Sequence, residues 1–185
     1  MSTLDFIRDD VKAMTAYHVA DLPEGFIKLD AMESPYHPFA GSPELLNEWT
    51  ALLAQADVHL YPNPAASGLQ EALREAFAIP EAASVALGNG SDELIQFITL
   101  LLAKPGATML AVEPSFVMYK QNAALFGMNY IGVPLNEDFT LDLAAVLKAI
   151  DTHNPALIFI AYPNNPTGVR FKREEVEAII RAAKG

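Results

Sequence analysis

Residues 107–135 read ATMLAVEPSFVMYKQNAALFGMNYIGVPL and combine two short apolar, β-rich runs with one helix-period stretch. The runs ATMLAV (107–112) and NYIGVPL (129–135) contain few polar residues, which indicates strands that are buried on both faces. The stretch 116–126 between them has the spacing of a helix that returns the chain to a neighbouring parallel strand. This unit predicts an α/β fold.

The same alternation of strand-like and helix-like segments extends along the rest of the chain from residue 84. Further apolar runs occupy 84–88 and 156–162, and further helix-period segments occupy 92–103, 141–150 and 173–183. We therefore expect a three-layer αβα arrangement, with a mostly parallel sheet and helices on both of its faces. No strand follows the last helix, so we expect the sheet to be incomplete at its C-terminal end.

The first 83 residues lack this alternation. Two helices are expected at 43–56 and 67–77, after an irregular arm at 20–42 that is rich in proline and glycine. An arm of this kind usually covers another surface, either of a second domain or of a neighbouring subunit.

The composition excludes several classes of function. The 185 residues include 23 acidic and 12 basic side chains, a net charge of −11, so nucleic acid and anionic membranes are poor partners. There is no cysteine, which excludes disulfides, thiolate zinc sites and cysteine nucleophiles. The four histidines have no metal-ligand spacing. The chain shows no signal peptide, and its longest apolar stretch, 94–103, is too short to span a bilayer, so we expect a cytoplasmic protein.

The strongest local motif is GNGSDE at residues 88–93, between an apolar run and a helix. Glycine lets the backbone approach a ligand closely, and a helix N-terminus offers unpaired N–H groups, so this motif can hold a phosphate. Its spacing is neither that of a dinucleotide motif nor that of a P-loop. Ordinary helix capping, with Ser91 as the N-cap residue and Asp92 and Glu93 in the first turn, explains the motif equally well.

Three further motifs lie in expected loops. YPNNPTG (162–168) follows an apolar run, and it can share a site with GNGSDE because ligands bind at the carboxyl ends of parallel strands. EPSFVMY (113–119) places an aromatic residue where it can stack on a flat heterocycle, and YPNP (61–64) places a phenol in a loop. Taken singly, these motifs are also compatible with a proline-rich turn, a core aromatic residue and a packed loop residue.

In this order and at these separations, the four motifs resemble those of the fold type I pyridoxal-phosphate aminotransferases. The resemblance runs from about residue 11 to the end of the chain, and YPNP, GNGSDE and an upstream LDAMESP (29–35) are similar to the histidinol-phosphate branch. It implies a homodimer with pyridoxal phosphate as cofactor. It also implies transamination between histidinol phosphate and 2-oxoglutarate, giving imidazole-acetol phosphate and glutamate, in histidine biosynthesis.

The resemblance implies roles for particular residues and regions. Cofactor-binding roles fall on residues of the four motifs: Gly90, Ser91 and Asp92 at the phosphate, Phe116 on the ring face, Asn165 at the 3-oxygen, and Tyr61 at the phosphate of the partner subunit's cofactor. A substrate-binding role falls on Tyr17. Residues 1–42 are expected to form a terminal helix and arm that contribute to a small domain and a dimer contact. Residues 43–185 are expected to form the N-terminal part of the large domain, which binds pyridoxal phosphate.

The chain also departs from the family pattern. Met32 stands where the family arm commonly has asparagine, and Phe116 lacks the hydroxyl of the usual tyrosine. None of the seven lysines lies in a Ser-x-Lys motif, so the Schiff-base lysine is expected beyond residue 185. The aspartate that pairs with the pyridine nitrogen and the C-terminal substrate-binding arginine are expected there too. We therefore expect these residues alone to be inactive.

Two other interpretations remain open. The first is another fold type I enzyme, either an aminotransferase for aromatic amino acids or a relative of the cobalamin-pathway decarboxylases. The second is a non-catalytic module that keeps the phosphate-binding segment and the dimer surface but performs no chemistry.

Overall fold

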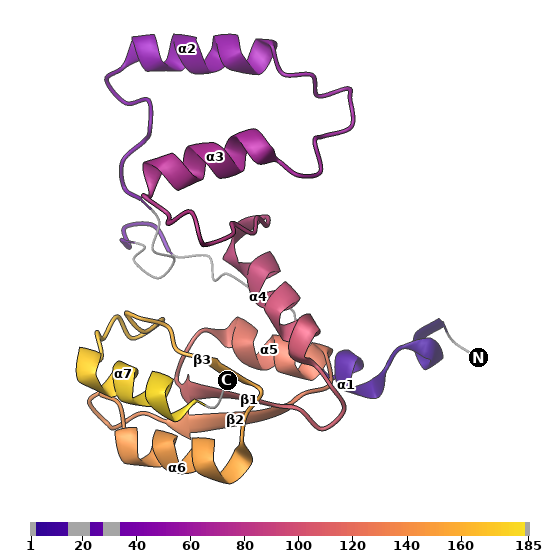
Figure 1. The fold of residues 1–185 in the computed structure, drawn as a ribbon, viewed down its shortest axis with the longest axis vertical. Helices are drawn as coiled ribbons and strands as arrows, with labels where there is room; N and C mark the ends of the chain where they lie inside the picture. Colours follow the sequence, from indigo (N-terminus) through magenta and orange to yellow (C-terminus); the bar gives the residue numbers. More distant parts are fainter. Residues whose placement is uncertain (1–2, 15–22, 28–33, 184–185) are drawn as a thin grey trace. The chain divides into compact units, whose positions relative to one another are not determined.

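The computed structural model describes residues 3–14, 23–27 and 34–183 (Figure 1). The chain divides into two compact units. The sheet unit combines Met1–Val19 with Gly88–Gly185, and the helical unit spans Ala20–Leu87. The division that the sequence suggested at residue 42 stays a prediction.

The sheet unit is built on a parallel sheet with the strand order β2-β1-β3. Leu110 in the central strand pairs with Ile131 on one side and Ile158 on the other. A helix follows each strand, as expected for crossover connections. In chain order these elements are β1 (Thr108–Glu113), α5 (Val117–Leu125), β2 (Asn129–Pro134), α6 (Leu143–His153), β3 (Leu157–Phe159) and α7 (Arg173–Ala182). The predicted α/β class is confirmed.

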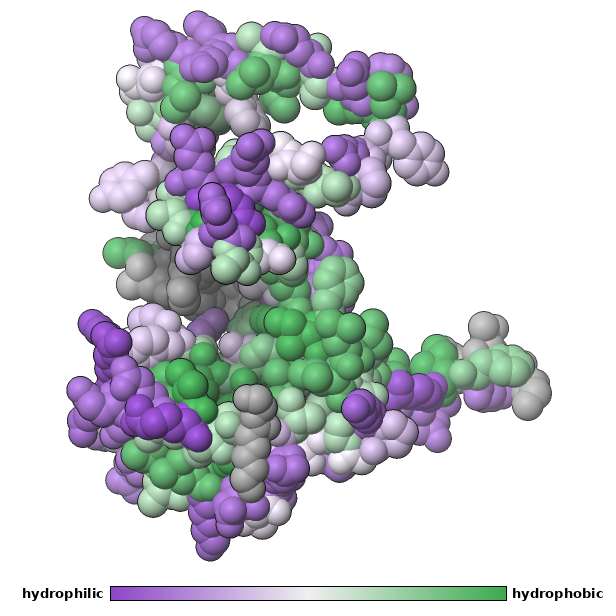
Figure 2. All heavy atoms as spheres, in the orientation of Figure 1, coloured by the Kyte–Doolittle hydropathy of each residue, from purple (hydrophilic) through white to green (hydrophobic). Residues whose placement is uncertain are grey.

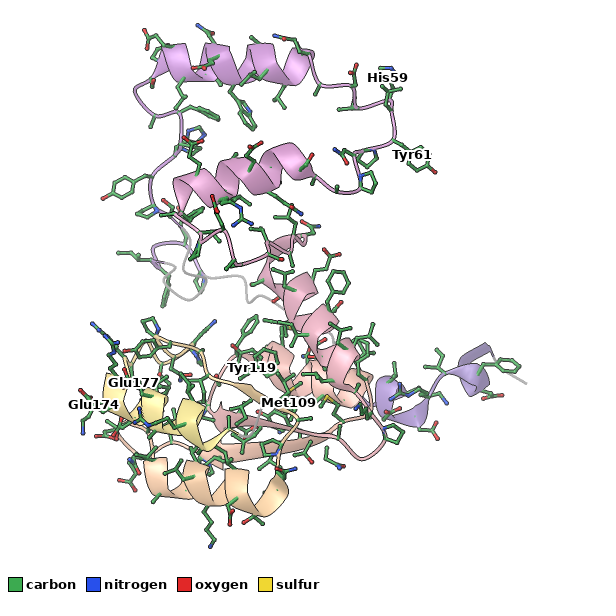
Figure 3. All side chains as sticks on the ribbon, in the orientation of Figure 1. His59, Tyr61, Met109, Tyr119, Glu174 and Glu177 are labelled. Atoms are coloured by element: carbon green, nitrogen blue, oxygen red, sulfur yellow. The ribbon has the colours of Figure 1, made fainter. Side chains whose placement is uncertain are left out.

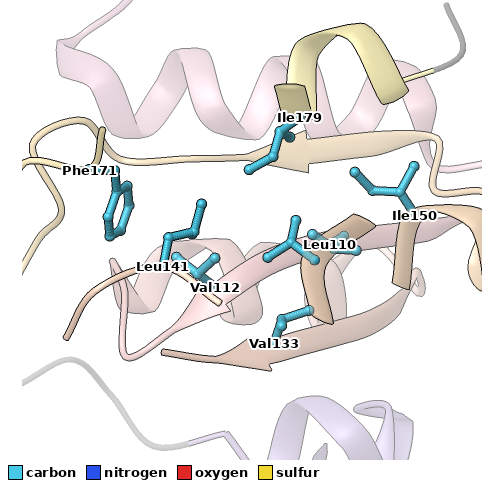
Figure 4. Packing of buried hydrophobic residues seen from close by; sticks show 8 residues of the cluster. Leu110, Val112, Val133, Leu141, Ile150, Phe171 and Ile179 are labelled. Carbon is cyan, nitrogen blue, oxygen red and sulfur yellow. The ribbon is translucent and has the colours of Figure 1, made fainter. Parts of the chain in front are cut away.

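Helices cover both faces of the sheet, because the side chains of β1 alternate between two apolar clusters. Leu110 and Val112 point toward α6 and α7, into a cluster that also contains Val133, Leu141, Val146, Ile150, Phe171 and Ile179 (Figure 4). Met109 and Ala111 pack on the α5 side. All four are fully buried, and a buried side chain of the size of Val, Leu or Met contributes about 1.5–3 kcal/mol. The predicted three-layer arrangement is confirmed.

One expected strand is absent. The run at 84–88 forms no regular structure in the described chain, so the prediction of a strand there is wrong. Extended backbone is stable as a strand only where a neighbouring strand takes its N–H and C=O groups, and 84–88 pairs with neither edge of the sheet. This run instead links the two units.

Helix α4 (Gly90–Leu102) joins the sheet unit by packing against α5. Thr99 is fully buried, and its Oγ1 donates to the carbonyl oxygen of Ile95 at 2.7 Å. Ile95 in turn contacts the cluster on the α5 side. The opposite side of the helix is exposed and apolar, with Phe97, Ile98, Leu100 and Leu101, and Figure 2 shows this apolar surface over α4.

Within the sheet unit, Arg8 bonds the N-terminal segment to the end of α5. This segment contains a 3-10 turn, η1 (Thr3–Phe6), and the short helix α1 (Asp9–Lys12). Between them, the Arg8 guanidinium donates to the carbonyl oxygens of Leu125 at 2.8 Å and Ala124 at 3.2 Å, at the end of α5. A cation at a helix C-terminus satisfies carbonyls that have no partner within the helix.

The helical unit contains α2 (Pro43–Ala54) and α3 (Ser67–Ala76). Ser42 begins α2, because its Oγ accepts the N–H of Leu45 at 3.4 Å and Pro43 occupies the first helical position. No residue of either helix is buried. Across both units, the helices predicted from residue 43 onward are confirmed within three residues of their expected bounds. None of the helices in the described residues combines the length and apolarity needed to cross a membrane.

Candidate functional site

Two of the sequence motifs meet at the carboxyl edge of the sheet. β1 ends at Glu113 and continues into Pro114–Phe116, whereas β3 ends at Phe159 and continues into the loop 162–168. The strands are adjacent and parallel, so both loops lie at one edge, where open α/β sheets bind ligands.

Asn164 joins the two loops and is 2% exposed. Its Nδ2 donates to the carbonyl oxygen of Pro114 at 3.0 Å and to Thr167 Oγ1 at 2.9 Å. Its Oδ1 accepts from Ser115 Oγ at 3.1 Å. The turn interpretation of YPNNPTG therefore holds for this asparagine, a residue that the sequence did not single out.

Asn165 is in a different position although it is the next residue. Its side chain is half-buried and makes no hydrogen bond to any described residue. The backbone around it is closed by two bonds, from Asn164 N–H to the Val169 oxygen at 2.9 Å and from Gly168 N–H to the Asn164 oxygen at 2.8 Å. The loop thus presents one asparagine whose donor and acceptor remain available for a ligand.

Phe116 lies at the start of α5 as its N-cap residue and is half-buried. Its ring meets the ring of Tyr119 edge to face, with centroids 5.6 Å apart. Tyr119 stacks on Phe159 of β3 at 4.6 Å and 3°, and Figure 3 shows it between α5 and the sheet. Burial raises the pKa of the Tyr119 phenol. Tyr119 is therefore the aromatic residue of this motif that lies in the hydrophobic core, whereas Phe116 lies at the edge of that core.

The predicted phosphate-binding segment, residues 88–92, begins α4. Gly90 has a left-handed φ of +81°, which favours glycine. An added Cβ at this position would meet no atom within 4 Å, so the segment is open above Gly90. Within the described chain, the N–H groups of Ser91 and Asp92 have no partner, and no side chain caps the helix. Free N–H groups at the positive end of a helix favour an anion.

The capping alternative for Ser91 is wrong in its detail. The N-cap residue is Asn89, and Ser91 is exposed inside the first turn. Glu93 turns back along the helix, and its carboxylate accepts the N–H of Asn89 at 2.6 Å. One of the amides at this end is thus occupied by an acidic side chain, while those of Ser91 and Asp92 are free.

A group of polar contacts among Glu113, Lys120 and Tyr130 lies beside Phe116, on the side of β1 that pairs with β2. The carboxylate of Glu113 extends across Gly132 of β2, and a Cβ at 132 would overlap with it. Lys120 Nζ lies 3.6 Å from Glu113 Oε1 and 5.6 Å from the centre of the Tyr130 ring. Burial and the Glu113 carboxylate raise the pKa of the Tyr130 phenol. No sequence pattern indicated this group.

The structure does not place either candidate tyrosine relative to this arrangement. Tyr61 belongs to the helical unit, in the loop between α2 and α3, and Figure 3 shows its side chain projecting away from both helices. It is fully exposed. Tyr17 lies outside the described residues. The structure thus brings Phe116 and Asn165 to one edge, and it gathers Gly90, Ser91 and Asp92 at the start of α4.

These features fit pyridoxal phosphate. Two unpaired amides and an open glycine suit a phosphate, a half-exposed ring suits a flat heterocycle, and the available amide of Asn165 suits a ring oxygen. No group of three or more His, Cys, Asp or Glu side chains that could hold a metal ion occurs in the described ranges.

Curated relatives are similar to this chain along its whole length. A histidinol-phosphate aminotransferase from Neisseria meningitidis serogroup B (strain MC58) is 70% identical over 184 residues, which are 100% of this chain and 50% of that protein. One from Chromobacterium violaceum is 55% identical over 186 residues, or 100% of this chain and 51% of that protein. The chain spans about half the length of the curated relatives it matches.

Solved structures of aminotransferases share the fold. The histidinol-phosphate aminotransferase from Sinorhizobium meliloti in complex with pyridoxal-5'-phosphate matches 77% of this chain and 38% of its own, with a TM-score of 0.67 and 26% identity. A tetra mutant of the aspartate aminotransferase from Thermus thermophilus matches 96% of this chain and 47% of its own, with a TM-score of 0.66 and 27% identity.

A family model gives the same result as the similar sequences, the similar structures and the four sequence motifs. The model for aminotransferase class I and II covers residues 25–185, which include all four motifs. The chain belongs to the class I and II aminotransferase family.

Proposed function

We propose that these residues form the cofactor-holding part of a pyridoxal-phosphate-dependent aminotransferase of histidine biosynthesis. It would act on histidinol phosphate and 2-oxoglutarate to give imidazole-acetol phosphate and glutamate. The observation that carries this proposal is the 70% identity, over the whole chain, to a relative named histidinol-phosphate aminotransferase. We also propose that the protein acts in the cytoplasm, and that it binds neither nucleic acid nor membranes, which fits its net charge of −11.

In this proposal each part of the site has one task. The amides of Ser91 and Asp92 bind the phosphate, and Gly90 lets it approach the backbone. Phe116 orients the ring by stacking, and Asn165 donates a hydrogen bond to the 3-oxygen. Pyridoxal phosphate, when bound, supplies the electron sink for charge that develops at the substrate α-carbon. Tyr17 near the substrate is part of the same proposal.

The proton transfers need a group that this chain does not offer in the expected motif. None of its seven lysines follows a Ser-x pattern. We therefore propose that the catalytic lysine lies outside residues 1–185 and that these residues alone are inactive. Borohydride reduction of residues 1–185 mixed with pyridoxal phosphate should attach no pyridoxyl group to a single lysine. Stoichiometric labelling of one lysine would contradict this assignment.

A homodimer with shared sites is also proposed. Tyr61 is fully exposed on its loop, as a residue that reaches a partner subunit must be. α2 exposes Leu45, Leu46, Trp49, Leu52 and Leu53, and apolar surface of this kind favours association. In the complete gene product, Tyr61→Phe should weaken pyridoxal-phosphate binding while light scattering still reports a dimer. Binding that Tyr61→Phe does not change would remove Tyr61 from the site.

The substrate is tested by steady-state kinetics of the complete gene product. We expect kcat/KM for histidinol phosphate to exceed that for phenylalanine and aspartate. Aspartate is included because an aspartate aminotransferase is among the similar structures. A strong preference for phenylalanine would favour an aromatic aminotransferase, and binding of pyridoxal phosphate without turnover of any amino donor would favour a non-catalytic module.

A further inference from the structure

The amide of Asn164 is held in one orientation. The Pro114 carbonyl oxygen can only accept a hydrogen bond, so the Nδ2 of Asn164, 3.0 Å away, must face it. Oδ1 then faces the hydroxyl of Ser115, and the second hydrogen of Nδ2 points to Thr167 Oγ1. Both donors and the acceptor of this buried side chain are therefore used inside the protein.

These bonds connect segments that are distant in sequence. Asn164 lies 50 residues from Pro114 and 49 from Ser115, in loops that follow different strands. Each loop carries one proposed cofactor contact directly beside the connection, since Phe116 follows Ser115 and Asn165 follows Asn164. Asn164 thus adds a direct link between the two loops, beside both proposed contacts, to the pairing of β1 with β3.

Resting on the proposed function, we propose that Asn164 is a positioning residue, which holds the stacking face of Phe116 and the amide of Asn165 at the separation that the cofactor requires. The connection is made entirely between protein groups, so it orients the two contacts independently of the cofactor. A site that is ordered in advance loses less conformational freedom on binding and binds more tightly. The hydroxyls of Ser115 and Thr167 complete the connection through their hydrogen bonds to Asn164.

Paired substitutions distinguish the effect of losing a hydroxyl group from the effect of changing the shape of the side chain. Thr167→Val removes the hydroxyl and keeps the branched shape, whereas Thr167→Ser keeps the hydroxyl. Ser115→Ala and Ser115→Thr form the second pair, which serves if Thr167→Val fails to fold. Thr140→Val is the control, because Thr140 hydrogen-bonds Asp138 in another loop and is outside the proposed site.

The first readout is hydrogen exchange of the cofactor-free gene product. Thr167→Val should speed exchange of the amides of residues 115–118, in the other loop, and Ser115→Ala should speed exchange in 164–169. The hydroxyl-retaining variants and Thr140→Val should leave the distant loop unchanged. Exchange that rises only next to each substitution would overturn the inference.

The second readout is the bound cofactor. Loss of one buried hydrogen bond predicts pyridoxal-phosphate affinity about tenfold lower in Thr167→Val and Ser115→Ala, with recovery in Thr167→Ser and Ser115→Thr. The visible circular dichroism of the bound ring should change in the same two variants. Unaltered affinity and circular dichroism in both would also overturn the inference. If the unsubstituted protein binds no pyridoxal phosphate, the proposed function fails, and the exchange result still decides whether Asn164 couples the loops.

Discussion

The stack of Tyr119 on Phe159 makes a prediction that a double-mutant cycle can test. The two rings come from α5 and β3, lie 3° from parallel with centroids 4.6 Å apart, and Tyr119 is buried. Stacked aromatic pairs contribute about 0.5–1.5 kcal/mol beyond the burial of their area. We therefore expect Tyr119→Leu and Phe159→Leu each to lower the free energy of unfolding by about 1–3 kcal/mol.

The two losses should not add. Once either ring is gone the stack is already lost, so the double variant should be less destabilised than the sum of the single variants by about 1 kcal/mol. Urea unfolding of the cofactor-free gene product measures all four free energies. Ile179→Val is the control partner for Tyr119→Leu, because Ile179 belongs to the cluster on the opposite face of the sheet. That pair should be additive.

Two outcomes would refute this reasoning. A coupling energy near zero for the aromatic pair would mean that the stack contributes only its buried area. A coupling of equal size for the control pair would mean that it arises from general loosening of the core.

Three further predictions concern the site and its support. Gly90→Ala should weaken pyridoxal-phosphate binding and cost about 1–2 kcal/mol of stability, because alanine at a φ of +81° is strained; equal binding and equal urea midpoints would contradict this. Asn165→Ala should change the free energy of unfolding by less than about 0.5 kcal/mol, since the side chain makes no bond among the described residues, yet lower cofactor affinity about tenfold. Unchanged affinity in a titration would exclude its assigned role. Burial raises the pKa of Tyr119 in the folded protein above its unfolded value, so its contribution to stability is complete below about pH 10 and declines as the pH rises further. Tyr119→Phe should reduce this alkaline loss in unfolding experiments, and an identical pH profile would argue against it.

Periodicity was enough to predict the fold class, because strands buried on both faces have a composition that few other structures share. β1 carries four consecutive fully buried apolar residues, and the helices that precede and follow it lie close to their predicted positions in the sequence. The run at 84–88 shows the limit of this argument. Its composition is that of a strand, but pairing depends on a neighbour, and no local pattern reports whether one is present.

The meeting of the loops 113–116 and 162–168 at one sheet edge follows from the predicted strands, whereas the separate roles of the residues in these loops do not. Asn164 and Asn165 are neighbouring residues of the same type, so the sequence does not distinguish them. The loop geometry buries the side chain of Asn164 and leaves that of Asn165 available to a ligand. The N-cap residue is Asn89 rather than Ser91, so α4 begins two residues earlier than the capping interpretation implied. The contact of Glu113 with Tyr130 requires Gly132 on the next strand, which is a tertiary relation that spacing does not reveal.

The alternation of Met109, Leu110, Ala111 and Val112 between two clusters has a consequence for the evolution of this protein. A codon gained or lost within these positions would exchange the side chains facing α5 with those facing α6 and α7, and both cores would receive the wrong shapes at once. Substitutions can be absorbed there one at a time, but a change of length cannot. Homologues should therefore vary in length in exposed loops such as 136–140, whereas the distance from Met109 to Val112 should be constant throughout the lineage.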